Sequence, residues 1–95
     1  MSEIHIDTTK IKECGTDIVS LSSELYEIID TMFRRINNVN KVTGEWVGSS
    51  ADIFINKANV DKLQYLTMQN QIYQYGKWLI DYANKMEDVV KEVQR

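Results

Sequence analysis

The residues best suited to nucleophilic or metal chemistry in this sequence are its only cysteine, Cys14, and its only histidine, His5. A zinc site needs three or four cysteine, histidine or carboxylate ligands, and a catalytic thiol needs a base beside it. The sequence offers neither set near these two residues. We therefore expect His5 to be solvated and Cys14 to be a small buried hydrophobic residue.

Carboxylates are the remaining candidates for acid–base chemistry. Glu24, Glu27 and Asp30 lie close together, but on positions of a predicted helix that should face solvent. Paired carboxylates without a pocket do not make an active site. The sequence also has no Ser/His/Asp order, no glycine-rich phosphate loop and no His-Glu-X-X-His motif. We predict that the protein is not an enzyme and binds no cofactor or metal.

Composition favours one small helical domain. The chain has 95 residues, no proline and four glycines, which permits long uninterrupted helices. The formal net charge is −3 and the basic residues are dispersed, which argues against nucleic acid as a partner. Charged residues in the first twenty positions exclude the apolar core of a signal peptide, and no apolar run reaches membrane-spanning length.

Apolar residues recur at alternating steps of three and four along two segments, the heptad pattern of helices that pack together. The pattern predicts a first helix over about residues 7–41, a turn over 42–48 and a second helix over about 49–94. Asp7 or Thr8 should cap the first helix. The predicted fold is all-α, a single domain made of an antiparallel two-helix hairpin. The seam between the helices is predicted to contain Ile11, Cys14, Ile18, Leu21, Leu25, Ile28, Met32, Ile36 and Val39, with Ala51, Phe54, Ala58, Tyr65, Met68, Ile72, Tyr75, Leu79, Tyr82, Met86, Val89 and Val93.

The predicted turn carries two glycines four residues apart. Glycine reaches backbone angles that other residues adopt only at a steric cost, so Gly44 can end the first helix and Gly48 can allow the reversal. Ser49 with Asp52 resembles a capping box at the start of the second helix. Trp46 is unusual in a turn, and its indole should either seal the end of the hairpin or face a partner.

The residues Trp46-Val47-Gly48, central in the chain and with a predicted helix on each side, resemble the motif of the hundred-residue WXG family. Members of that family are exported by the type VII (Esx) secretion system, which is typical of Gram-positive bacteria. The resemblance implies a non-enzymatic protein that is made in the cytoplasm and secreted without a cleaved signal peptide. It also implies that the type VII secretion ATPase is a partner and that Trp46 and Gly48 belong to the export signal.

A second set of apolar residues remains on each helix once the seam is subtracted, although a hairpin working alone should have a polar outside. In an antiparallel hairpin the extra apolar residues of the two helices lie level with one another, near the middle of the hairpin. We expect an exposed patch that packs on another helical hairpin to form a four-helix bundle; scattered surface residues are the alternative. The sequence leaves open whether the bundle is a homodimer or a heterodimer. The predicted partner interface consists of Val19, Tyr26, Ile29, Phe33, Val60, Leu63, Leu66, Tyr73 and Ile80.

The C-terminal part of the second helix should extend past the start of the first. Tyr82, Met86, Glu87 and Val90 are therefore candidates for recognition in a groove of another protein. In the WXG family a Tyr-X-X-X-Asp/Glu pattern near the C-terminus completes the export signal. Here Met86 stands four residues after Tyr82, and Glu87 stands five after it. This departure fits a chain whose partner supplies the tyrosine half of the signal, or a helper that escorts a larger substrate.

Two further functions stay open. One is a targeting chaperone for a larger type VII toxin, which co-purification of an unequal partner would favour. The other is an intracellular coiled-coil adaptor with no link to secretion, which absence from the culture medium would favour.

Overall fold

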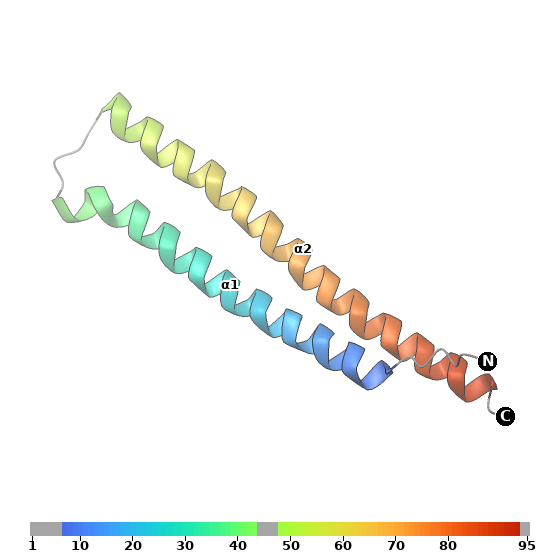
Figure 1. Ribbon diagram of the computed structural model, residues 1–95. Coiled ribbons are helices and arrows are strands. Elements are labelled where there is room, and N and C mark those ends of the chain that lie inside the picture. Colours follow the sequence, from blue (N-terminus) through green and yellow to red (C-terminus); the bar gives the residue numbers. More distant parts are fainter. Residues whose placement is uncertain (1–6, 44–47, 94–95) are drawn as a thin grey trace.

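A computed structural model of the chain describes residues 7–43 and 48–93, and for residues 40–43 the backbone alone. Helix α1 spans Thr8–Thr43 and helix α2 spans Ser49–Val93. The two helices run antiparallel, side by side, in an elongated hairpin of 72 × 21 × 18 Å (Figure 1). The predicted all-α hairpin is confirmed. Helix α1 continues two residues beyond its predicted end, so the connection between the helices is shorter than expected.

Each helix begins at a residue suited to that position. The Asp7 carboxylate accepts the backbone N–H of Lys10 at 3.1 Å, and the Asp7 carbonyl accepts that of Ile11 at 3.2 Å. Asp7 therefore caps α1, satisfying a first-turn N–H that has no partner within the helix. At α2 the Gly48 carbonyl accepts the N–H of Asp52 at 3.1 Å. Gly48 has a φ of 98°, an angle at which a side chain would be strained, so the entry into α2 requires glycine.

The helices meet along a narrow line of small residues. A Cβ atom added to Gly15 would lie 2.7 Å from the carbonyl oxygen of Gly76, and one added to Gly76 would lie 2.9 Å from that of Gly15. No side chain fits between the backbones there. Ser22 and Ala83 are both fully buried on the same line, and Ala58 is nearly so. These small residues set the close approach of the two helices.

Larger side chains fill the contact toward the turn. Ile29 and Phe33 are 2% and 3% exposed and form a buried cluster with Ala58. The Phe33 ring lies 5.8 Å from the Tyr65 ring, measured between centroids. The partly buried residues that pack against this cluster are Leu25, Ile36 and Leu66.

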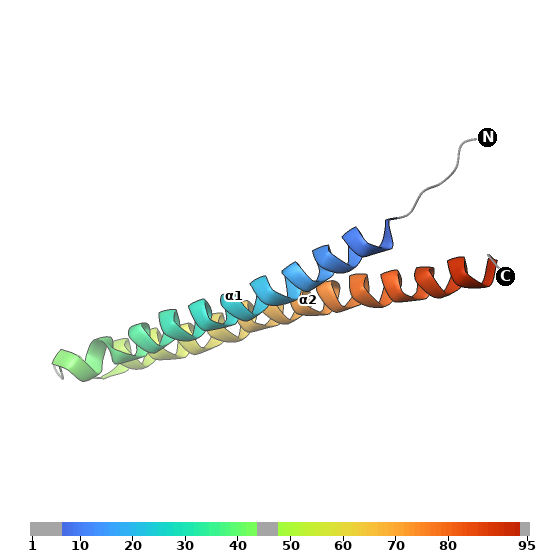
Figure 2. The same cartoon turned by 90° about the horizontal axis from the view of Figure 1, so that it is seen from below.

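Polar contacts between the helices help to fix their register. The Gln69 side-chain amide donates a hydrogen bond of 3.0 Å to the Ser22 carbonyl, and Lys12 forms an ion pair of 3.1 Å with Glu87 near the open end. Beyond Glu87, α2 extends past the start of α1, as predicted (Figure 2). Val93 on this extension is 80% exposed, because no α1 residue lies beside it.

Candidate protein interface

The helices do not meet along the whole of the predicted seam. Leu21 and Ile28 are 59% and 62% exposed, and Cys14 is exposed as well. Ser22 and Ile29, each one position later, are buried. Successive helix residues point about 100° apart, so α1 is turned by about one position from the predicted orientation. The predictions that Leu21 and Ile28 face α2 and that Cys14 is buried are wrong.

The predicted partner interface is corrected for the same reason. Ile29 and Phe33 were expected on an exposed patch, and that expectation is wrong because both lie in the core between the helices. Val19 packs at the helix crossing, beside the position that a side chain on Gly76 would occupy. Contact of the exposed members with a partner stays a prediction. Val19, Leu66, Tyr73 and Ile80 are partly buried, whereas Tyr26, Val60 and Leu63 are exposed.

Ala58 of the predicted seam does lie on this line of small residues. Gly15, Ser22 and Ala83 were missed because the heptad count followed mainly larger apolar side chains. Gly15 and Ser22 are seven positions apart on α1, and Gly76 and Ala83 are seven positions apart on α2. A row of small residues lets two helix backbones approach, and the large residues at the same heptad position then become the core. The seven-residue spacing of small residues was the signal that could have identified this contact.

The predicted seam residues that do not face the opposite helix lie on one side of the hairpin, in α1 and in α2 alike. Ser23 of α1 and Asn70 of α2 each follow a residue of the helix contact by one position, and together they line a shallow hollow. That hollow marks one side of the hairpin. Leu21 and Met68 each precede the contact by one position, so helix geometry places them together on the opposite side.

We call this opposite side the apolar face. Its side chains repeat at heptad spacing along both helices, and several are about half exposed or more, Tyr75 at 57% among them. An extended apolar surface of this kind usually marks an interaction site. The apolar face consists of Leu21, Leu25, Ile28 and Met32 of α1 with Tyr65, Met68, Ile72 and Tyr75 of α2.

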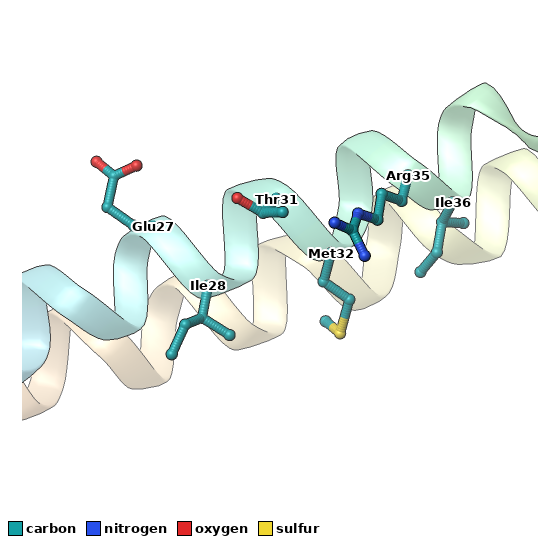
Figure 3. A pocket seen from close by; sticks show the side chains of 6 residues that line it. All are labelled: Glu27, Ile28, Thr31, Met32, Arg35 and Ile36. Carbon is teal, nitrogen blue, oxygen red and sulfur yellow. The ribbon is translucent and has the colours of Figure 1, made fainter.

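A cation interrupts the α1 part of this face. Figure 3 shows Ile28, Met32 and Ile36 pointing to the same side of α1, where they line a shallow hollow with Arg35. Arg35 lies seven positions after Ile28 and is exposed, and its side chain extends toward Met32. A partner that covers this part of the face must therefore accommodate a positive charge.

Aromatic rings line the outer edge of the apolar face on α2. The Trp78 ring stacks on Tyr75 with centroids 5.9 Å apart and on Tyr82 with centroids 5.4 Å apart. Trp78 is 55% exposed. It was not among the predicted interface residues, although its spacing of three and four from the two tyrosines places it on the same side of the helix.

The predicted C-terminal recognition residues are engaged to different degrees. Tyr82, Met86 and Glu87 are partly buried, and Val90 is 44% exposed. A hydrogen bond from the Lys12 ammonium holds the pKa of Glu87 below its ordinary value, against the partial desolvation that would raise it. Glu87 thus belongs to a contact between the two helices as well as to the predicted recognition segment.

Of the motif that resembles the WXG family, the structure describes Gly48, whereas Trp46 lies outside the described residues. In residues 7–43 and 48–93, neither helix is apolar enough to cross a membrane, and no group of three His, Cys, Asp or Glu could hold a metal ion. Comparisons with protein-family models, with curated proteins and with solved structures find no match to this chain. The resemblance therefore rests on the residues of the turn and on the helix at each side.

Proposed function

We propose that this chain is a non-enzymatic protein of the type VII (Esx) secretion pathway that acts by packing its apolar face on another helical hairpin. The observation that carries the proposal is the apolar face itself, where Leu21, Ile28 and Tyr75 are more than half exposed. The link to secretion comes from the residues Trp46-Val47-Gly48 between two long helices.

The core of the hairpin buries few large side chains, which supports the proposal that the protein packs on a partner. Three of the five buried hydrophobic residues in the described part of the chain are alanines. Burying a whole leucine or isoleucine side chain contributes about 1.5–3 kcal/mol, so covering the exposed half of Leu21 or Ile28 contributes about 1 kcal/mol each. Over the whole face this reaches several kcal/mol, comparable with the entire stability of a small domain.

In this proposal the protein is made in the cytoplasm and leaves the cell through the type VII ATPase without a cleaved signal peptide. Trp46 and Gly48 contribute one half of the export signal. The test compares culture medium from the source bacterium with and without that ATPase. We expect the protein in the medium when the ATPase is present, loss of export in Trp46→Ala, and normal export in the neighbouring control Glu45→Ala.

Requirement for the apolar face is tested separately. Ile28→Asp should reduce export because it places a charge on the face, whereas Ser23→Asp, on the opposite side, should not. Retention of the wild-type protein in cells with an active ATPase would overturn the link to secretion and favour the intracellular adaptor.

One sequence feature favours a second candidate within the same pathway. Met86 occupies the place where the family pattern has an acidic residue after Tyr82. A chain with an incomplete C-terminal signal suits a targeting chaperone that escorts a larger toxin whose own signal is complete. Purification of the tagged protein from the source bacterium separates the candidates, because a chaperone brings down a larger helical partner in equal amount.

A further inference from the structure

We infer that the polar hollow on the side of the hairpin opposite the apolar face binds the guanidinium group of an arginine side chain that a partner protein inserts. The hollow has a volume of about 390 Å³ and is lined by both helices. It stays open when the apolar face is covered, because the two lie on different sides of the hairpin. This inference goes beyond the proposed function, and its test does not depend on export. The residues that line the hollow are Ser23, Tyr26 and Glu27 of α1 and Gln69, Asn70 and Tyr73 of α2.

A carboxylate gives the hollow its charge. Glu27 is exposed, and Figure 3 shows its carboxylate pointing away from the side of α1 on which Ile28 and Met32 lie. The acidic partners in the ion pairs of residues 7–43 and 48–93 are other residues, so the Glu27 charge is not neutralised by them. The described residues that line the hollow include no lysine or arginine. The hollow therefore favours a cation.

The fixed hydrogen bonds of the hollow leave acceptors for a ligand. The Ser23 hydroxyl donates to the Val19 carbonyl at 3.3 Å, which leaves the oxygen lone pairs of the hydroxyl. The Gln69 side-chain nitrogen donates to the Ser22 carbonyl at 3.0 Å, which leaves the amide oxygen. The Glu27 carboxylate can only accept. A ligand that brings several N–H donors matches these groups.

Two tyrosine rings favour a flat cation. Tyr26 is exposed and Tyr73 is partly buried. Side chains on a helix lean toward its N-terminus, and the two helices are antiparallel, so the rings converge from the two ends of the hollow on the height of Ser23 and Asn70. A guanidinium group is flat and stacks on aromatic rings, and its fork of N–H donors can bond several acceptors at once. An ammonium group has fewer donors and no flat face.

The shape of the hollow favours an arginine of a protein over a free small molecule. A small molecule is usually held where most of its surface is enclosed, whereas this hollow is shallow and open to solvent. Partly buried apolar side chains continue along the same side, with Val19 and Ile80 toward the open end of the hairpin and Leu66 toward the turn. A protein that covers these residues can insert an arginine into the hollow between them.

NMR titration of the isotope-labelled full chain with short blocked peptides tests the inference. The probe is a peptide with one arginine between two leucines, and its controls carry citrulline or lysine in place of the arginine. Citrulline has nearly the shape of arginine but no charge. We expect the arginine peptide to shift the amide signals of Ser23, Asn70 and Tyr73 and to bind about fivefold more tightly than either control. Blocked arginine alone should bind more weakly than the peptide, because it leaves the flanking apolar residues uncovered.

Matched variants identify the groups that hold the ligand. Glu27→Gln should weaken binding of the arginine peptide by about fivefold or more. Glu24→Gln makes the same change of charge at an exposed carboxylate that does not line the hollow, and it should leave binding unchanged. Tyr26→Leu should weaken binding about two- to fivefold, whereas Tyr26→Phe keeps a ring and should bind as the wild type does. Ser23→Asp adds a second carboxylate and should tighten binding, a gain that a damaged fold would not produce.

Several results would overturn the inference. Equal binding of the citrulline peptide would exclude the charge as the cause, and equal binding of the lysine peptide would exclude the choice of guanidinium. Shifts at Leu21 and Met68 instead of Ser23 and Asn70 would assign the peptide to the apolar face. Absence of binding by the arginine peptide would exclude the site, and blocked arginine that binds as tightly as the peptide would exclude a protein as its source. The proposed function would stand in every case, because its own test is export.

Discussion

Replacing either glycine at the helix crossing gives the sharpest test of the observed contact. Helix propensity alone predicts that Gly15→Ala and Gly76→Ala each stabilise the protein by about 1 kcal/mol, because alanine favours an interior helix position. The structure predicts the opposite sign. The added Cβ would lie 2.7 Å from the Gly76 carbonyl oxygen in the first variant and 2.9 Å from the Gly15 carbonyl oxygen in the second.

The size of the loss follows from what must move. The obstructing atoms are backbone oxygens of the opposite helix, so the helices must separate by a few tenths of an ångström or more. Overpacking of this kind costs about 1–3 kcal/mol. Separation also loosens the buried contacts of Ser22 and Ala83 on the same line. After the gain in helix propensity, we expect each single variant to lose about 1–2 kcal/mol.

The double variant should lose less than the sum of the singles, because one separation of the helices accommodates both methyl groups. Urea unfolding followed by circular dichroism measures these changes, at several protein concentrations to identify any contribution from assembly. Ser20→Ala, an exposed position on α1, is the matched control and should be stabilised by a few tenths of a kcal/mol. If the glycine variants are stabilised like this control, the helices do not approach at Gly15 and Gly76 and the contact described here is wrong.

Three further predictions concern the orientation of α1, the backbone at Gly48 and the ion pair between Glu87 and Lys12. Ile29→Ala should lower the free energy of unfolding of the monomer by about 2–5 kcal/mol, while its neighbour Ile28→Ala should change it by less than about 0.5 kcal/mol, in urea titrations below the assembly concentration; equal losses would refute the orientation of α1. Gly48→Ala should be destabilised by about 1 kcal/mol or more, because the φ of 98° at this position disfavours any side chain. Steric obstruction is not the reason, since no atom of residues 7–43 and 48–93 lies within 4 Å of the added methyl group; unchanged thermal stability would contradict this prediction. Because the folded-state pKa of Glu87 is lowered, its contact with Lys12 stabilises the fold above the ordinary pKa of 4.5 and is lost as the pH falls below it. The difference in melting temperature between wild type and Glu87→Gln should therefore be present at pH 7 and diminish as the pH falls below 4.5 and through the lowered pKa of Glu87; a difference that stays constant on acidification would refute the ion pair as its cause.

The hairpin could be predicted because it depends on local signals. The heptad repeats extend through both helices, proline is absent, and Asp7 and Gly48 stand at the starts of the two helices. Each of these acts within a few residues along the chain, so one sequence suffices to read it. The same holds for the extension of α2 beyond α1, which follows from the unequal lengths of the two repeats.

The orientation of the helices could not be read in the same way. Each helix carries two neighbouring rows of apolar residues. Hydrophobicity alone does not decide which of the two rows packs on the other helix. Gly15 and Gly76 determine which row faces the other helix, because they have no side chain and so allow the two backbones to approach. That absence has value only where another backbone approaches, and the approach is a property of the pair of helices.

By itself the sequence therefore determined that the chain forms two amphipathic helices and reverses direction between them at a glycine-containing turn. It also determined that the helices carry more apolar surface than one contact between them can bury. The tertiary structure alone decided which surface is buried, placing Ile29 inside and its neighbour Ile28 outside. The physical reason is that secondary structure responds to spacing along one chain, whereas packing responds to the shape that two helices present to each other, and a shift of one residue turns the exposed face by about 100°.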